Sequence, residues 1–173
     1  VKEIAGLLEM EEMNRPEEEV KLKNDEIEFS DVSFSYGDTE VLHNISFKTV
    51  TNGITAFVGP SGSGKSTVAR LIASFWEASE GSVKIGGEDV RNLPLSQVMK
   101  EIAYVSQDNY LFHLSVKENI RIGKPDATDE EIVKAAKKAS SHDFITSLSN
   151  GYDTVAGDGG NNLSGGEEQR IAI

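Results

Sequence analysis

The sequence predicts an α/β protein whose strands come first along the chain and whose helices come later. Alternating apolar residues over Ile27–Phe34, with one slip in the alternation, are typical of a half-buried strand that carries a bulge. The uncharged apolar run Ile54–Val58 is typical of a strand buried on both faces, and it leads directly into a glycine-rich loop. Helical patterns dominate from Val116 onwards. This order favours a nucleotide-binding α/β core followed by a separate helical lobe.

Turns, caps and periodicity predict the remaining elements. A turn at Gly37–Asp38 leads to a second strand, roughly Ile45–Thr49. Thr128 and Glu131 fit a capping box at the start of a helix. Further strands are predicted at Val83–Ile85 and Ile102–Val105, and further helices over Lys65–Phe75, over His142–Leu148 and from Ser164.

Composition narrows the class of protein. The 173 residues are 38 % hydrophobic and include no cysteine, which excludes disulfides, zinc-thiolate sites and thiol nucleophiles. No stretch approaches the ~18 apolar residues that a membrane-spanning helix needs. The three histidines, His43, His113 and His142, are scattered and lack metal-ligand spacing. We therefore expect a soluble domain in a reducing compartment, with the cytoplasm as the default.

The negative charge is concentrated near the start of the chain. The net charge is −12, and residues 1–31 hold 11 acidic and 4 basic side chains. Such a surface repels the phosphates of nucleic acids, so a nucleic-acid partner is disfavoured. Val1–Met10 has helical spacing, whereas Glu11–Asp25 contains Pro16 and few apolar residues and is predicted to be a solvated linker.

The glycine-rich loop Gly59-Pro-Ser-Gly-Ser-Gly-Lys-Ser-Thr67 satisfies the pattern G-x-x-x-x-G-K-[ST]. Its glycines let the backbone curl so that successive N–H groups face inward and reach phosphate oxygens. The helix that starts near Lys65 adds the positive end of its dipole. An ordinary glycine-rich turn is the alternative, but the place between a buried strand and a helix is the one that phosphate binding requires. The loop therefore predicts a nucleotide site.

Each residue type in the loop has a chemical reason. Lys65 is expected to supply a mobile point charge to the β- and γ-phosphates, and Ser66 a hydroxyl to Mg²⁺, which prefers hard oxygen ligands. The expected cofactors are ATP and Mg²⁺. The predicted nucleotide contacts in this loop are Gly59, Pro60, Ser61, Gly62, Ser63, Gly64, Lys65, Ser66 and Thr67.

A second motif, Leu163-Ser-Gly-Gly166 followed by Gln169-Arg170, makes a family resemblance plain. Together with the phosphate loop it resembles the ATP-binding domain of ABC transporters, and the resemblance covers residues 1–173 almost without gaps. It implies a P-loop NTPase core with an N-terminal antiparallel β subdomain and a helical subdomain over about residues 108–173. In that family the second motif opens a helix whose N-terminus touches the γ-phosphate held by the other subunit. A flexible helix cap is the alternative for Ser-Gly-Gly alone.

The resemblance implies nucleotide contacts from Leu163, Ser164, Gly165, Gly166 and Glu167. The family most often has Gln at the last of these positions. A carboxylate pointing inward would be repelled by the γ-phosphate, so we expect the Glu167 side chain to point away.

Two single residues also match the family. Tyr36, in Phe34-Ser-Tyr-Gly37, resembles the aromatic residue that stacks on adenine, although it could also be a hairpin aromatic that packs on a neighbour. Gln107 resembles the glutamine that joins the core to the helical lobe and reaches Mg²⁺ and the attacking water. The resemblance thus implies catalytic roles for Lys65 and Gln107 and metal contacts from Ser66 and Gln107.

The subclass and the partners also follow from the resemblance. Val155–Gly160 is similar to the extra segment of exporter-type ABC proteins, and residues 1–24 resemble a linker that follows a transmembrane segment. Residues 25–173 would then be the ATP-binding domain, on the cytoplasmic face of the cell membrane. Its implied partners are a second ATP-binding domain and the transmembrane coupling helices, the latter near Leu111-Phe112 and Val116–Ile120.

One family feature is missing from these residues. The Walker B strand ends in Asp-Glu after an apolar run, but the Asp-Glu pairs here, Asp25-Glu26 and Asp129-Glu130, do not follow one. We therefore expect the ATP-binding domain to be incomplete at its C-terminus and these residues alone to hydrolyse little ATP.

The leading hypothesis is an ATPase domain that powers export. Two alternatives stay open: a soluble ABC-type ATPase of DNA repair or translation, and a non-catalytic nucleotide-binding subunit of a heterodimer.

Overall fold

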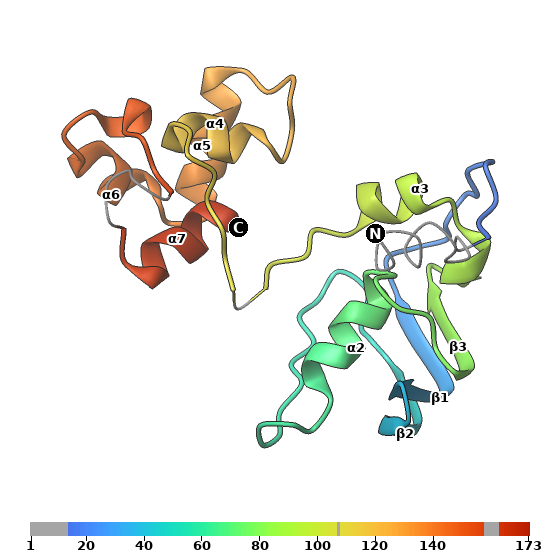
Figure 1. The fold of residues 1–173 in the computed structure, drawn as a ribbon. Coiled ribbons are helices and arrows are strands. Elements are labelled where there is room, and N and C mark those ends of the chain that lie inside the picture. Colours follow the sequence, from blue (N-terminus) through green and yellow to red (C-terminus); the bar gives the residue numbers. More distant parts are fainter. Residues whose placement is uncertain (1–13, 107, 158–162) are drawn as a thin grey trace, which may run out of the picture. The chain divides into compact units, whose positions relative to one another are not determined.

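The computed structural model describes residues 14–106, 108–157 and 163–173, and the chain divides into two compact units between Tyr104 and Val105. The first unit consists of a sheet with helices beside it, and the second is mostly helical (Figure 1). Each unit has its own hydrophobic core. The predicted helix over Val1–Met10 lies outside the described residues.

One antiparallel sheet, in the strand order β2-β1-β3-β4, forms the frame of the first unit. Register shifts that begin between Phe29 and Val32 mark bulges in β1, which confirms the slip seen in its alternation. The second strand begins at Thr39 rather than near Ile45, because Tyr36 already pairs with Thr39 across a tight turn. The strands are β1 (Ile27–Tyr36), β2 (Thr39–Lys48), β3 (Glu80–Ile85) and β4 (Glu88–Asp89).

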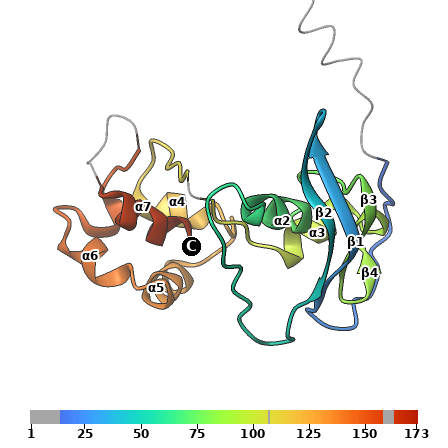
Figure 2. The same cartoon turned by 90° about the horizontal axis from the view of Figure 1, so that it is seen from below.

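Helices α2 (Lys65–Ile72) and α3 (Leu95–Glu101) lie beside this sheet, and a short 3-10 turn, η1, spans Val90–Asn92 (Figure 2). α2 starts where the sequence predicts. It ends at Ile72 rather than Phe75, and Ser74 just beyond it has a φ of 55° that a helix cannot continue through. The core beneath it combines residues of the sheet and both helices: Phe29, Val32, Phe34, Leu42, Val68, Leu71, Val83, Ile85, Val90, Leu93 and Val98.

The second unit packs short helices around a smaller core. The predicted capping box is confirmed: the Glu131 carboxylate accepts from the Thr128 N–H at 2.9 Å, and the Glu131 N–H donates to the Thr128 hydroxyl at 3.3 Å. The elements are α4 (Val116–Arg121), α5 (Asp129–Lys138), α6 (His142–Ser147), the 3-10 turn η2 (Gly151–Asp153) and α7 (Gly165–Ala172).

Two predicted strands are not present. Ile54–Val58 and Ile102–Val105 both lack regular structure, and the side chains of Ile54 and Val58 are each 95 % exposed. A buried strand needs a neighbour on its hydrogen-bonding edge, and the strand pairing within the described residues supplies none for either segment. An uncharged apolar run has the composition of a buried strand, but that composition does not show whether a neighbouring strand is there to pair with it.

Residues 14–24, which belong to the segment Glu11–Asp25 predicted to be a solvated linker, make specific contacts with the first unit. The guanidinium of Arg15 forms an ion pair with Glu77 at 3.1 Å and donates to the Val90 carbonyl. The amide of Gln97 donates to the Val20 carbonyl at 2.6 Å and accepts from the Val20 N–H at 2.9 Å. The polar composition of this segment predicted exposed side chains, and most of them are exposed. Composition could not predict which residues these few contacts would join.

Over the described residues, no helix combines the length and the apolar character that a membrane crossing requires.

Candidate nucleotide-binding site

The glycine-rich loop leads into α2 through two residues with left-handed backbone conformations. Gly62 and Gly64 have φ values of 82° and 83°, and Gly64 is the N-cap of the helix. The Gly64 carbonyl accepts the N–H of Val68 at 2.9 Å, the first hydrogen bond of the helix. The loop itself is exposed from Gly59 to Ser63.

Gly64 is required for a second reason. A Cβ atom placed on it would lie 2.5 Å from Cδ2 of Leu42, whose side chain is only 3 % exposed. The start of α2 therefore packs its backbone directly against β2. This close approach fixes the position of the loop relative to the sheet.

The ammonium group of Lys65 lies over the loop. Nζ donates to the carbonyls of Gly59 and Pro60 at 3.0 and 2.7 Å and to the hydroxyl of Ser63 at 3.2 Å. A long cationic side chain held above a curled backbone is the arrangement that a phosphate-binding lysine needs.

The helix end beneath the loop is electrostatically suited to an anion. The first turn of α2 contains no acidic residue, and no side chain caps its N-terminal N–H groups. These groups and the helix dipole therefore act together at the loop. Ser66 is exposed in this turn, whereas Thr67 is 6 % exposed and faces inward.

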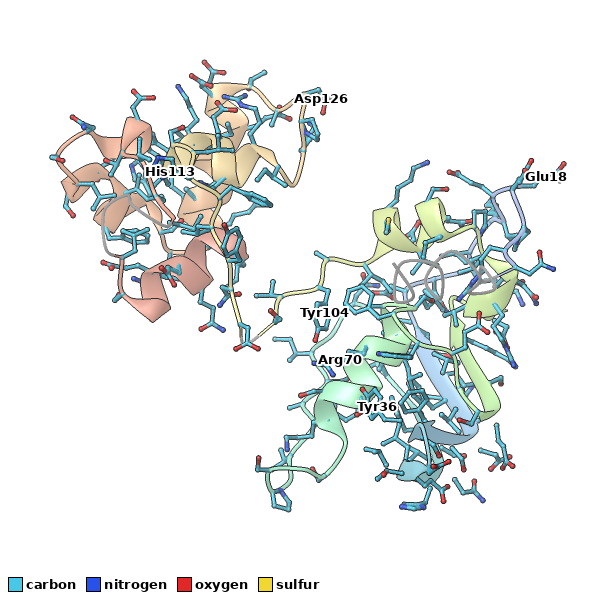
Figure 3. All side chains as sticks on the ribbon, viewed as in Figure 1. Glu18, Tyr36, Arg70, Tyr104, His113 and Asp126 are labelled. Carbon is cyan, nitrogen blue, oxygen red and sulfur yellow. The ribbon has the colours of Figure 1, made fainter. Side chains whose placement is uncertain are left out.

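Tyr36, at the end of β1, lies against α2 (Figure 3). Its hydroxyl accepts a hydrogen bond from Nη1 of Arg70 at 3.3 Å, and its ring meets Phe34 and Trp76 edge to face. Burial alone would raise the pKa of the Tyr36 phenol, but hydrogen bonds with Thr67 and Arg70 outweigh it and lower the pKa. The ring thus packs on its neighbours and is tied to the phosphate-loop helix at the same time.

The Leu163–Gly166 motif begins α7, with Ser164 as the N-cap, so the predicted helix start is confirmed. Leu163 packs against the core of the second unit. Gly165 and Gly166 are exposed, and a Cβ on Gly165 would meet nothing within 4 Å. The helix end is therefore open on the side of its glycines.

Glu167 does not point away from this helix end, contrary to the prediction. Its Oε2 atom accepts the N–H and the hydroxyl of Ser164, at 2.8 and 2.7 Å. These two hydrogen bonds lower the pKa of the Glu167 carboxyl. The prediction considered only repulsion by a phosphate and overlooked the attraction of the unpaired N–H groups at the helix start.

Within the first unit, the phosphate loop leads into α2, and Tyr36, at the end of β1, contacts the same helix at Arg70. Leu163–Gly166 lies in the second unit. Gln107 lies outside the described residues, as does the Asp158–Gly160 part of the exporter-like segment. The contacts of Thr67 and Arg70 with Tyr36 were not foreseen. Thr67 and Arg70 are three residues apart on a predicted helix, and this spacing could have indicated that both side chains lie on the same face of it.

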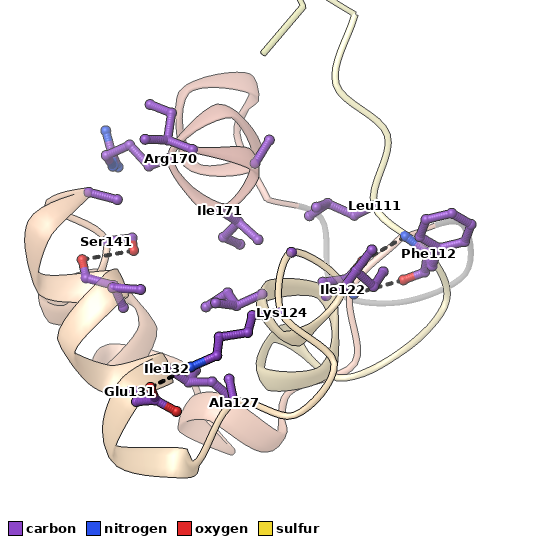
Figure 4. Close-up of a pocket in the computed structure, with 18 of the residues that line it drawn as sticks. Leu111, Phe112, Ile122, Lys124, Ala127, Glu131, Ile132, Ser141, Arg170 and Ile171 are labelled. Atoms are coloured by element: carbon purple, nitrogen blue, oxygen red, sulfur yellow. Dashed lines mark hydrogen bonds and ion pairs between the residues drawn. The ribbon is translucent and has the colours of Figure 1, made fainter. Parts of the chain in front are cut away.

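A separate pocket of about 470 Å³ lies wholly within the second unit (Figure 4). Apolar side chains dominate its lining, and an ion pair between Lys124 and Glu131, 2.7 Å long, lies at one side. Its residues include Leu111, Phe112, Ile120, Ile132, Ala136 and Ile171.

A glycine-rich loop that leads directly into a helix, a lysine held over that loop and a helix N-terminus without a side-chain cap define a P-loop nucleotide-binding protein. The sequence model of the ABC transporter family matches residues 42–173. The chain belongs to the ABC transporter family.

Two relatives and one solved structure extend this comparison. The chain is 44 % identical over 156 residues to a protein of Staphylococcus aureus (strain NCTC 8325 / PS 47) whose name proposes a multidrug export ATP-binding/permease protein, covering 89 % of this chain and 27 % of that one. It is 43 % identical over 168 residues to a protein of Haemophilus influenzae (strain ATCC 51907 / DSM 11121 / KW20 / Rd) whose name proposes an ABC transporter ATP-binding/permease protein, covering 96 % and 30 %.

The solved structure is that of a bacterial Atm1-family ABC exporter with ATP bound. It matches with a TM-score of 0.90 at 36 % identity, covering 99 % of this chain and 31 % of that one. The antiparallel β subdomain and the helical subdomain are thus those of an ABC ATPase. The chain spans less than a third of the length of the curated relatives it matches.

Proposed function

We infer that this chain is the ATP-binding domain of an ABC exporter, which couples ATP binding and hydrolysis to transport across the membrane. The observation that carries the proposal is the placement of the Lys65 ammonium over the Gly59–Ser63 backbone, above a helix end free of acidic residues. The loop and Lys65 would hold the β- and γ-phosphates, and Tyr36 would stack on adenine. Ser66 and Gln107 would hold Mg²⁺, which neutralises phosphate charge when bound.

Hydrolysis would be an in-line attack by water on the γ-phosphate, catalysed by positioning and by charge stabilisation. A second ATP-binding domain would present Ser164–Gly166 to the nucleotide held by the first. The Asp129-Glu130 pair does not suit the role of general base. Asp129 accepts from Arg121 at 2.6 Å and pairs with Lys117 at 3.6 Å, at the start of α5.

The pocket of the second unit would receive a coupling helix of the transmembrane domain. Tyr110 and Phe112 at this pocket are 65 % and 51 % exposed, and their rings meet edge to face at 5.3 Å. Two large aromatic side chains beside an apolar hollow are suited to an apolar helix face. The domain would then lie on the cytoplasmic face of the cell membrane. Its net charge of −12 argues against a nucleic-acid partner.

The test is the affinity for ATP in the natural full-length protein. Lys65→Ala removes the charge above the loop, and we expect the Kd for ATP to rise at least about tenfold, as for a lost charge-assisted hydrogen bond. Lys137→Ala, which removes an exposed charge on α5, is the matched control and should leave the Kd unchanged. An unchanged Kd for the Lys65 variant would refute the site.

A further inference from the structure

We propose that Arg70 acts as a positioning residue that holds the ring of Tyr36, through its hydroxyl, in the place from which the ring can stack on the nucleotide base. This inference rests on the proposed function. It adds that the base site and the phosphate site are held in register by a single helix, α2.

The hydroxyl of Tyr36 is held by a side chain of α2. Nη1 of Arg70 donates to it at 3.3 Å. Thr67 is three residues before Arg70, so the two side chains project from one face of the helix. Because the phosphate loop leads directly into α2, the hydroxyl is attached to the same helix that the phosphate loop begins.

The ring of Tyr36 is held on its sides as well. Its centroid lies 4.8 Å from that of Phe34 and 5.5 Å from that of Trp76, with interplanar angles of 89° in both cases. Edge-to-face neighbours at these distances limit the rotation of the ring. The hydrogen bond from Arg70 fixes where the far end of the ring lies.

Tyr104 lies on the far side of Arg70. Its ring packs on that of Phe75 at 5.0 Å, and Figure 3 shows Arg70 between Tyr36 and Tyr104. Hydrogen bonding to the two phenols raises the pKa of the guanidinium, so Arg70 stays charged. A guanidinium held on two sides is a rigid donor, whereas a free arginine would add little order.

The chemical consequence is preorganisation. Base stacking needs a ring at a defined offset and angle, and ordering that ring at the moment of binding would reduce the affinity. Stacking uses only the ring. The hydroxyl of Tyr36 would therefore matter for affinity only if it positions the ring, and this separates the proposal from stacking alone.

The experiment compares ATP with inorganic tripolyphosphate, which lacks a base, as ligands of the natural full-length protein. Tyr36→Phe keeps the ring and loses the hydroxyl, and Arg70→Gln replaces the guanidinium that reaches this hydroxyl with a shorter, uncharged amide. We expect each to raise the Kd for ATP about threefold to tenfold, the size of one lost hydrogen bond, and to leave the Kd for tripolyphosphate unchanged. The double variant should be no weaker than either single variant. Arg91→Gln, which removes an arginine charge paired with Asp89, is the control and should change neither Kd.

The possible failures are distinguishable. If Tyr36→Ala weakens ATP binding but Tyr36→Phe and Arg70→Gln do not, stacking stands and the positioning role is wrong. Additive effects in the double variant would also overturn the positioning role. An unchanged Kd for Tyr36→Ala would instead remove the stacking role on which the inference rests. A loss of tripolyphosphate binding in Arg70→Gln would show that Arg70 acts through its charge.

Discussion

The Oε2 atom of Glu167 accepts both the N–H and the hydroxyl of Ser164, at 2.8 and 2.7 Å. A hydroxyl that donates to a carboxylate cannot donate to a phosphate at the same time. The negative charge also offsets the positive end of α7. Glu167 would therefore compete with the γ-phosphate of a nucleotide held by a second domain.

We predict that Glu167→Gln strengthens the ATP-dependent association of two ATP-binding domains about twofold to fivefold, the size of a charge effect at an exposed helix N-terminus. The gain should shrink at high salt, which screens the charge. Sedimentation with ATP at two ionic strengths measures both effects. Glu168→Gln removes an equal charge from the same helical turn but leaves the bonds between Glu167 and Ser164 in place, so it should have a smaller effect. A weaker association for Glu167→Gln would mean that the carboxylate assists the site.

Gly64→Ala should destabilise the first unit more than Gly62→Ala does. Both residues have φ values near 80°, and the left-handed conformation costs a residue with a Cβ about 1–2 kcal/mol. At Gly64 the new Cβ would also lie 2.5 Å from buried Leu42, whereas at Gly62 it would meet nothing within 4 Å. We expect the contact to add about 1–3 kcal/mol. Chemical denaturation measures the difference, and equal losses would show that the contact relaxes freely.

Gln97→Ala should release residues 14–24 from the first unit. Gln97 is 5 % exposed, and its amide pairs with both the N–H and the carbonyl of Val20. Leaving these groups without partners costs about 1–3 kcal/mol. We expect faster hydrogen exchange at Val20 and a lower free energy of unfolding. Met99→Ala, on the same helix and 67 % exposed, is the control. Unchanged exchange at Val20 would mean that other contacts hold the segment.

Asp89 should make stability depend on pH in the acid range. Burial would raise the pKa of its carboxyl, but hydrogen bonds from the side chain and backbone of Arg91 lower it below its ordinary value. A lowered folded-state pKa gives stability that is complete above the unfolded value, about 3.9, and is lost as pH falls through the folded value.

Asp89→Asn should therefore flatten the fall in unfolding free energy below about pH 4. Asp38→Asn, in the exposed turn before β2, serves as the control. Parallel curves for Asp89→Asn and the parent chain would contradict this origin of the pH dependence.

Short sequence patterns predicted those features that depend only on residues close together in the chain. The loop before α2, the capping box of Thr128 and the N-cap at Ser164 each need only residues within one or two helical turns, so their patterns were sufficient.

Features that depend on contacts between residues far apart in the chain could not be predicted from the sequence. Ile54–Val58 has the composition of a buried strand, but pairing is decided by what lies beside it. The attachment of Val20 to Gln97 joins residues 77 positions apart, and no periodic pattern encodes it. Tyr36 was identified by its aromatic ring, whereas its hydroxyl contacts on α2 became visible only when the hairpin and the helix were placed together.

The attachment of residues 14–24 changes what this end of the domain does mechanically. A flexible chain absorbs a pull by straightening, because its ends can separate over many ångströms at little cost. Here Arg15 is paired with Glu77, and Val20 is joined to Gln97 of α3 by two hydrogen bonds. A pull on this segment would therefore be passed to the first unit at these contacts before the segment straightens.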